Sequence, residues 1–290
     1  MIKQISLLLP TRGRRTLVYR FLNSVLETAA EPSKIEVIIC SDDDDDDSRD
    51  IKFPSLNLIQ VVVPRQNMGA YNAICLERAS GEISIAVNDD MIFRTKGWDD
   101  IVREIDGRFP DGIYLAYGND LFKGRKLCTF PIMSRKMTDL MLEVYPRAYK
   151  GAFIDVHLMD IFKRLEKKGI QRFIYIENIV MEHVHYRVNT SVLDKTYTER
   201  ARFDDDYTFA ELISLREAEA ERLVYAIKFP ERPLHPHSFS PVSLHRRGIF
   251  FPIRAYVRLF LLDANLPLSW RCYLCVWMIL RFYYAGFKKA

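Results

Sequence analysis

Residues 83–92, Ile83-Ser84-Ile85-Ala86-Val87-Asn88-Asp89-Asp90-Met91-Ile92, give the clearest indication of the fold class. It begins as an apolar run with β-branched side chains at alternate positions, which is typical of a strand buried on both faces of a parallel sheet. The run then stops at Asn88-Asp89-Asp90, which would emerge at the carboxyl end of the strand, where open α/β sheets bind ligands. Clustered oxygen ligands there suit a hard cation such as Mg²⁺ or Mn²⁺. The alternative interpretation is a solvated pair of aspartates after a strand.

Composition places the chain among ordinary globular proteins. Its 290 residues are 49% hydrophobic and 28% charged, which allows one large domain or one medium domain with an appendage. The net charge of +4 is mild and argues against generic nucleic-acid binding. The five cysteines are an odd number without the spacing of a disulfide framework, and Met1 to Gln4 runs directly into a strand. We therefore predict no cleavable signal peptide, a reducing compartment and a cytoplasmic location.

Strands and helices alternate before and after the opening stretch. Apolar strands are predicted at 5–9, 35–40 and 58–63, and helices at 16–30 and 71–79. This order with short loops indicates an α/β sandwich with a largely parallel sheet. Because the carboxyl ends of parallel strands share one edge, the polar loops after these strands should converge there. The loops are Thr11–Arg14, the aspartate run Asp42–Asp47, Arg65–Gly69 and Asn88–Asp90.

The C-terminal tail has a different character. Residues 229–247 are rich in proline and histidine and predict a linker, and residues 248–290 are aromatic and cationic with helical spacing. Arg271 and Arg281 interrupt the apolar run from 266 to 287, and each would be costly at the centre of a bilayer. The tail is therefore expected to be amphipathic and helical. It either lies on an anionic membrane surface or packs on protein, and both alternatives stay open.

In these motifs, taken in order, the chain resembles the GT-A nucleotide-sugar glycosyltransferases, in particular the inverting, family 2-like group that builds bacterial surface polysaccharides. The resemblance covers about the first hundred residues. The matching segments are Leu9-Pro10-Thr11-Arg12-Gly13-Arg14, Val37-Ile38-Ile39-Cys40-Ser41-Asp42-Asp43, Asn67-x-Gly69-x-x-Asn72, Ala79-Ser80-Gly81-Glu82-Ile83 and the acidic signature at 88–90. The resemblance implies a GT-A catalytic domain over 1–228, with a donor half at 1–107 and an acceptor half at 108–228.

The resemblance also implies donor-binding roles. Thr11 and Arg12 would contact the nucleotide, and Asp42 or Asp43 would accept a hydrogen bond from the base, usually uracil. Only the first one or two aspartates of the run are expected to be functional, because a run of like charges is most often a solvated loop. Arg65, Asn67 and Gly69 would face the ribose or phosphate side of the donor.

The metal site is implied in the same way. The last carboxylate of the family's Asp-x-Asp motif maps to Asp90 and would coordinate Mn²⁺ or Mg²⁺ bridging the diphosphate. Asn88 departs from the commonest pattern, since its amide offers an oxygen but no charge, so Asp89 could contribute. His183 and His185 lie on a predicted strand with their side chains on the same face. Either could be a further metal ligand, and His183 is preferred.

An inverting transferase needs a general base for the acceptor hydroxyl. The segment Gly151-Ala152-Phe153-Ile154-Asp155 precedes a predicted helix, and the resemblance places the base there. Asp155 at a helix N-cap could be base, cap or both, and Asp160 is a weaker candidate.

The resemblance implies transfer of a sugar, with a UDP-sugar as the expected donor, to a glycan or lipid-linked acceptor. A sugar nucleotidyltransferase is disfavoured because the loop after the first strand holds one glycine. A non-catalytic scaffold of the same fold, binding a membrane or a partner through 248–290, is the alternative from another class.

Overall fold

The computed structural model describes residues 2–184, 203–234, 239–244 and 250–289. The chain forms two compact units, one made of Met1–Arg147 with Ile174–Arg200 and the other of Ala148–Phe173 with Ala201–Ala290. These divisions differ from the expected boundaries at 228 and 247, because the segment at 148–173 groups with the C-terminal helices. His185 lies outside the described residues.

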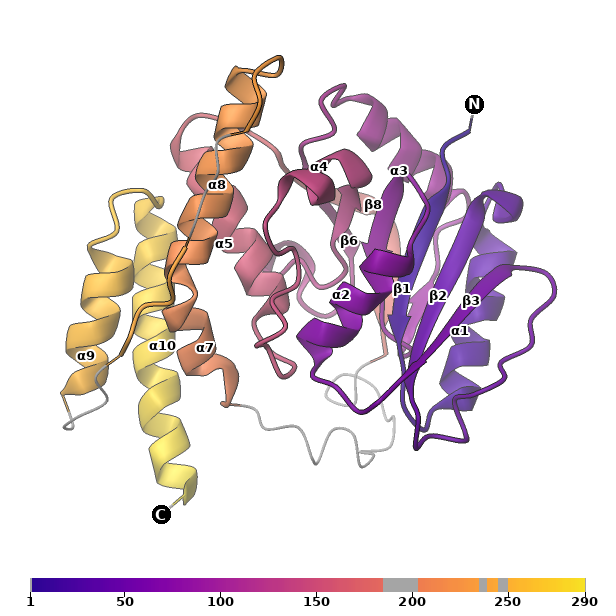
Figure 1. The fold of residues 1–290 in the computed structure, drawn as a ribbon, viewed down its shortest axis with the longest axis horizontal. Coiled ribbons are helices and arrows are strands. Elements are labelled where there is room, and N and C mark those ends of the chain that lie inside the picture. Colours follow the sequence, from indigo (N-terminus) through magenta and orange to yellow (C-terminus); the bar gives the residue numbers. More distant parts are fainter. Residues whose placement is uncertain (1, 185–202, 235–238, 245–249, 290) are drawn as a thin grey trace. The chain divides into compact units, whose positions relative to one another are not determined.

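The first unit contains the sheet and the helices that cover it (Figure 1). Its elements are β1 (Ile5–Pro10), α1 (Arg15–Thr28), η1 (Pro32–Lys34), β2 (Ile35–Asp42), β3 (Asn57–Val63), α2 (Met68–Arg78), β4 (Ile83–Ala86), β5 (Met91–Phe93), α3 (Trp98–Gly107), β6 (Leu115–Asn119), η2 (Gly124–Lys126), β7 (Ile132–Ser134), α4 (Arg135–Leu140) and β8 (Phe173–His183).

The sheet has eight strands in the order β3-β2-β1-β4-β7-β6-β8-β5. The first four are parallel, with Ile5 opposite both Ile35 and Ile83. From β7 onward the described pairs are antiparallel, so the sheet is mixed. β1 and β2 are buried along their whole length, as their continuous apolar sequences predict. The expected α/β class is confirmed. The strand that was expected to carry His183 is β8, and His183 is its last residue.

A buried carboxylate ties β2 to the turn that leads into β4. Glu36 accepts hydrogen bonds from the Ser6 hydroxyl (2.6 Å) and from the amides of Ser80 (2.6 Å) and Gly81 (3.2 Å). Burial opposes ionisation, but these bonds lower the pKa of Glu36 below its ordinary value. The segment Ala79–Ile83 thus has a structural role, since it fixes where β4 begins.

Gly81→Ala is expected to destabilise the first unit. A Cβ at Gly81 would lie 2.6 Å from the Ser6 Oγ and 2.8 Å from the Gln4 carbonyl oxygen, so the backbone must shift. Overpacking of this kind costs about 2 kcal/mol in the free energy of unfolding. Urea denaturation measures it, with Gly107→Ala as control because a Cβ there meets nothing within 4 Å. Equal stability of the two variants would contradict the role of Gly81.

The second unit is helical (Figure 1). Its described elements are α5 (Ile154–Lys167), α7 (Asp205–Glu211), α8 (Ile213–Lys228), α9 (Phe251–Tyr256), the π-helical turn η3 (Val257–Leu261) and α10 (Leu268–Lys289). The expected helical tail is therefore present as α9, η3 and α10. Among the helices of the described ranges, none is both long enough and apolar enough to cross a lipid bilayer.

The polar groups of the tail are bonded to other helices of the second unit. The Trp270 Nε1 donates to Asp160 (2.8 Å). The Arg281 guanidinium forms an ion pair with Asp206 (2.6 Å), and Asp263 pairs with Arg164 (2.7 Å). These contacts show that the tail packs on other helices of the second unit, and binding to a membrane surface stays a prediction.

Candidate active site

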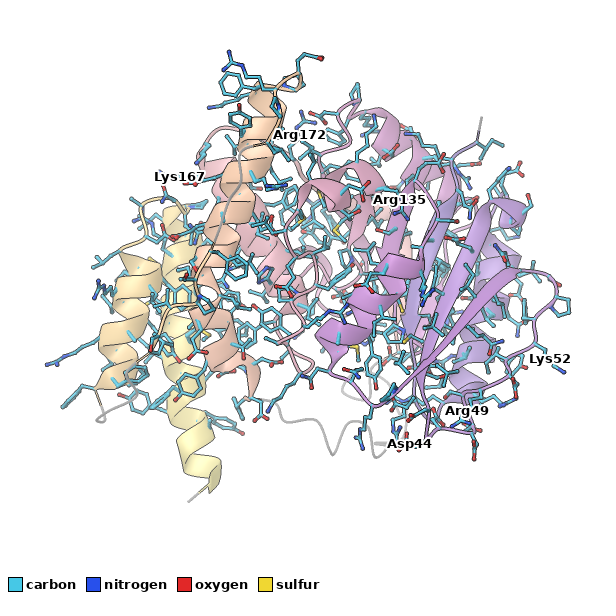
Figure 2. All side chains as sticks on the ribbon, viewed as in Figure 1. Asp44, Arg49, Lys52, Arg135, Lys167 and Arg172 are labelled. Carbon is cyan, nitrogen blue, oxygen red and sulfur yellow. The ribbon has the colours of Figure 1, made fainter. Side chains whose placement is uncertain are left out.

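Four loops meet at the carboxyl edge of β3, β2, β1 and β4, as the parallel order predicts. Thr11 donates its hydroxyl to Asp89 (2.8 Å), so the loops after β1 and β4 are bonded directly. Arg12 forms ion pairs with Asp42 and Asp44 on the loop after β2. Figure 2 shows Asp44 and Arg49 at this edge, on the loop after β2.

The loop after β3 joins this edge through a residue that the sequence did not single out. Tyr71, in the first turns of α2, donates its hydroxyl to Asp42 and accepts the Gln66 amide (2.7 Å). Burial and the bond to Asp42 raise the pKa of the Tyr71 phenol. Arg65 and Asn67 are exposed beside it, while Gly69 is buried in the first turn of α2. A tyrosine in an otherwise ordinary helix carries no signal of this contact in the sequence.

The aspartates of the run 42–47 differ in their burial and in their contacts. Asp42 is buried, whereas Asp43 and Asp44 are exposed. Asp45 is only 7% exposed and accepts the amide of Gly13 (2.8 Å), so it holds the loop after β1 in place. The Asp46 side chain is 95% exposed. The run is therefore not a uniformly solvated tail after its first residues, because its fourth aspartate is a buried structural group.

The acidic signature forms a tight turn. The Met91 amide donates to the Asn88 carbonyl (3.1 Å), so Asp89 and Asp90 are the central residues of a turn that Asn88 begins. Asparagine and aspartate are favoured in the first position of such turns, which accounts physically for an amide at 88. Only Asp89 and Asp90 of the three are buried.

Asp89 and Asp90 have different partners. Asp89 is held by Thr11 and by Arg14, whose guanidinium donates at 2.9 Å. Burial raises the pKa of Asp89 to about 6; Arg14 opposes this shift and the neighbouring charge of Asp90 adds to it. Arg14 is a second residue of this edge that the site prediction omitted, although the sequence places a cation there.

Asp90 lies beside His183. β5 pairs with β8 so that Met91 is opposite His183, and the Val184 amide donates to the Asp90 carbonyl (2.9 Å). The His183 Nε2 and the Asp90 Oδ2 are 3.4 Å apart, and the imidazole packs edge-on against Phe130 (5.5 Å between ring centroids). The strand pairing therefore brings together two residues that are far apart in the sequence.

A divalent metal fits this pair by the chemistry of its donors. A carboxylate oxygen and an imidazole nitrogen are both ligands that Mn²⁺ accepts, and a hard cation takes further oxygen ligands from water or phosphate. Within the described residues, no group of three or more His, Cys, Asp or Glu side chains is placed to hold a metal ion. Asp90 and His183 would therefore supply two protein ligands of an open site.

Asp155 belongs to the second unit, where a strained turn precedes it. The N-cap of α5 is Phe153, with a φ of 65°, and not Asp155 as expected. A positive φ is uncommon for a bulky residue, and its ring is stacked on Phe209 (4.8 Å). Asp155 lies in the first turn, partly exposed, and its Oδ1 accepts the Val156 amide (2.8 Å).

Another carboxylate fixes the backbone before this turn. Asp205 accepts hydrogen bonds from the amides of Lys150 (2.8 Å), Gly151 (2.9 Å) and Ala152 (2.7 Å). Asp205 is buried, and three amide bonds to one carboxylate are strong charge-assisted interactions. The segment that leads to Asp155 is thus held in one conformation.

Asp160, the weaker candidate for the base, is a buried residue that bonds to other helices of the second unit. Its side chain is 0% exposed and accepts from Arg216 (2.8 Å), Arg164 (3.3 Å) and Trp270. The two guanidiniums outweigh the effect of burial and lower the pKa of Asp160. A buried carboxylate with these partners links α5, α8 and α10 and is not placed to accept a proton from a substrate.

Comparison with known proteins supports the same family and fold. The model of the family described as glycosyl transferase family 2 matches residues 6–142. The match spans all four loops of the edge and ends before Asp155 and His183. A search of curated protein sequences found no match.

Solved structures with a similar fold extend over nearly the whole chain. The mannosyltransferase PcManGT from Pyrobaculum calidifontis, in complex with GDP-Man and Mn²⁺, is 14% identical with a TM-score of 0.51, over 99% of this chain and 76% of that one. Residues 1–349 of TarS from S. aureus are 13% identical with a TM-score of 0.52, over 99% and 91%. At these identities the likeness shows the fold alone.

Proposed function

We infer that residues 6–142 form a glycosyltransferase family 2 domain, because the family model matches them and the chain shares its fold with the mannosyltransferase PcManGT. We propose that the protein transfers a sugar from a nucleoside diphosphate sugar to a hydroxyl of a glycan or lipid-linked acceptor in surface polysaccharide synthesis. A UDP-sugar is the expected donor. The observation that carries this proposal is the edge where Thr11 and Arg14 are bonded to Asp89 and Arg12 is bonded to Asp42, next to the Asp90–His183 pair.

On the donor side, Asp42 is the residue proposed to bind the base. One of its oxygens accepts from Arg12 and the other from Tyr71, and each carboxylate oxygen has a second lone pair for a base N–H. Asp42 is preferred of the two candidates because Arg12 and Tyr71 fix its carboxylate, whereas Asp43 is exposed. Arg65 and Asn67 would face the ribose and phosphates.

Asp90 and His183 would hold Mn²⁺ or Mg²⁺, and the bound ion would neutralise charge that develops on the departing nucleoside diphosphate. Asp155 would take the proton from the acceptor hydroxyl while that oxygen attacks the anomeric carbon, in a single displacement with inversion. Thr11 and Arg14 hold Asp89 in the turn before Asp90, and so keep the Asp90 carboxylate oriented.

A donor screen tests the proposal. Purified protein with Mn²⁺ is incubated with UDP-, GDP-, dTDP- and CMP-sugars, and released nucleotide is measured. We expect turnover of UDP-sugars above the other donors. Calorimetric titration with UDP and Mn²⁺ separates the outcomes: absence of both turnover and binding would favour a non-catalytic scaffold and overturn the proposal.

A lipid-linked acceptor would require attachment to the membrane surface, and α9, η3 and the start of α10 are proposed to supply it. Four large apolar side chains and two arginines are exposed there: Phe250, Ile253, Leu262, Leu268, Arg254 and Arg258. Apolar and cationic side chains together suit an anionic interface. In vesicle flotation, we expect binding to phosphatidylglycerol but not phosphatidylcholine vesicles, and loss of binding in the double variant L262D/L268D. Unchanged flotation of that variant would exclude this surface as the anchor.

A further inference from the structure

Three aromatic rings of α10 form a near-parallel row. The ring centroids of Trp270 and Tyr273 are 5.2 Å apart with an interplanar angle of 26°, and those of Tyr273 and Trp277 are 5.5 Å apart with an angle of 18°. Spacings of three and four residues place such side chains on one face of a helix. We call this set, Trp270, Tyr273 and Trp277, the aromatic row.

The two outer rings are anchored at fixed positions. Trp270 donates its Nε1 to the buried Asp160, which two arginines hold. Trp277 lies against Phe153, with 5.0 Å between ring centroids. The Arg281 guanidinium, paired with Asp206, lies 5.2 Å from the Trp277 ring. The row is therefore preorganised, so binding of a ligand would cost little further conformational entropy of these protein side chains.

The central ring is open to solvent. The Tyr273 side chain is 48% exposed between the two half-buried tryptophans. Exposed apolar surface of this kind, with a polar tip at the Tyr273 hydroxyl, commonly marks a binding site.

The row lies next to the start of α5. Trp277 contacts Phe153, two residues before Asp155. Burial raises the pKa of the Tyr273 phenol, and the charge of Asp155 adds to this shift while Arg281 opposes it. The Asp155 carboxylate therefore interacts electrostatically with the exposed Tyr273 side chain.

An exposed aromatic ring together with a carboxylate favours a sugar as the ligand. The face of an aromatic ring carries negative charge density and attracts C–H groups that bear partial positive charge, such as those on the apolar face of a pyranose. The hydroxyls at the rim of a sugar can donate to a carboxylate. Anionic lipid headgroups would be repelled by the charge of Asp155.

We propose that the aromatic row is the acceptor subsite, where a neutral pyranose stacks on Tyr273 with its hydroxyls toward Asp155. This inference rests on the proposed glycosyltransferase function and assigns a glycan to its acceptor side. It gives α10 a role in substrate binding in addition to its role in packing.

Tryptophan fluorescence tests the subsite without requiring turnover. Of the three tryptophans in the sequence, Trp98 is wholly buried on α3, so a change on ligand addition reports Trp270 and Trp277. Full-length protein is titrated with the methyl pyranosides of glucose, galactose, mannose and N-acetylglucosamine, and with sorbitol as an acyclic control. We expect a saturable change with at least one pyranoside and none with sorbitol.

Variants of Tyr273 distinguish stacking of the sugar on its ring from an effect of any substitution on α10. Tyr273→Ala is expected to weaken pyranoside binding about five- to tenfold, whereas Tyr273→Phe, which keeps the ring, should bind nearly as the parent does. Tyr284→Ala is the matched control, because Tyr284 is 49% exposed on the same helix outside the row. Circular dichroism melts confirm that each variant is folded, and Tyr273→Leu replaces Tyr273→Ala if the alanine variant is not.

Each other outcome overturns the subsite. It fails if no pyranoside gives a saturable change, if Tyr273→Ala and Tyr284→Ala bind equally, or if phosphatidylglycerol vesicles and not pyranosides change the signal. Failure of the donor screen with intact pyranoside binding would instead reject the transferase and leave a sugar-binding surface.

Discussion

Asp90→Ala is expected to lower the rate of metal-dependent sugar transfer about 10²- to 10⁴-fold. The Asp90 carboxylate is one of two candidate ligands 3.4 Å apart, and loss of it would remove most of the charge that holds the cation. Metal stabilisation of a leaving diphosphate contributes several kcal/mol to the barrier, and each 1.36 kcal/mol is tenfold in rate. Initial rates at saturating UDP-sugar across a range of Mn²⁺ concentrations measure the effect.

Three further variants sharpen this experiment. Asp46→Ala makes the same substitution on a fully exposed aspartate of the same edge and should leave the rate unchanged. Asp90→Asn keeps an oxygen ligand without charge, so its transfer rate should lie between those of Asp46→Ala and Asp90→Ala. His183→Ala should raise the Mn²⁺ concentration needed for half-maximal rate. Transfer by Asp90→Ala with an unaltered Mn²⁺ dependence would place the metal elsewhere.

Asp155→Asn is expected to reduce kcat about 10²- to 10⁴-fold while UDP binding is unchanged, since general-base catalysis contributes effects of this size. Asparagine keeps a side-chain oxygen, so the hydrogen bond from the Val156 amide can persist and the start of α5 need not change. A loss of rate would therefore report lost basicity and not a lost helix terminus. Steady-state rates and calorimetric UDP titration measure the two quantities.

Asp204→Asn is the control for this variant. Asp204 is a more exposed acid of the same unit, paired with Lys150 (2.8 Å) at the surface, and such pairs contribute little. Its kcat should stay within about twofold of the parent value, because an exposed ion pair contributes little to the structure around it. Full activity of Asp155→Asn would show that the base is another residue, without affecting the assignment of the donor site.

Much of the donor edge could be predicted from the sequence because it follows from one geometric rule. Successive apolar strands joined through helices, as β1 is to β2 and β3 is to β4, are expected to lie parallel, and the carboxyl ends of parallel strands share an edge. The loops at Thr11, Asp42, Arg65 and Asp89 could be placed together without knowledge of any contact. The contacts within that edge were not predictable. Tyr71 reaches Asp42 only because α2 packs on β1 and β2, and helical periodicity does not reveal that.

The fold class, the order of the motifs and the helical character of the tail could be predicted from the sequence, since these depend on local periodicity and on chain order. The pairing of charged groups could not be predicted, because it depends on tertiary packing. The run Asp42–Asp47 gives no indication that Asp45 is buried on the Gly13 amide, nor does the tail show that Arg281 pairs with Asp206. The approach of His183 to Asp90 likewise comes from the pairing of β5 with β8, which are about ninety residues apart. A long-range pair depends on how distant segments pack, and the acidic turn at Asn88–Asp90 acquires its second candidate ligand in this way.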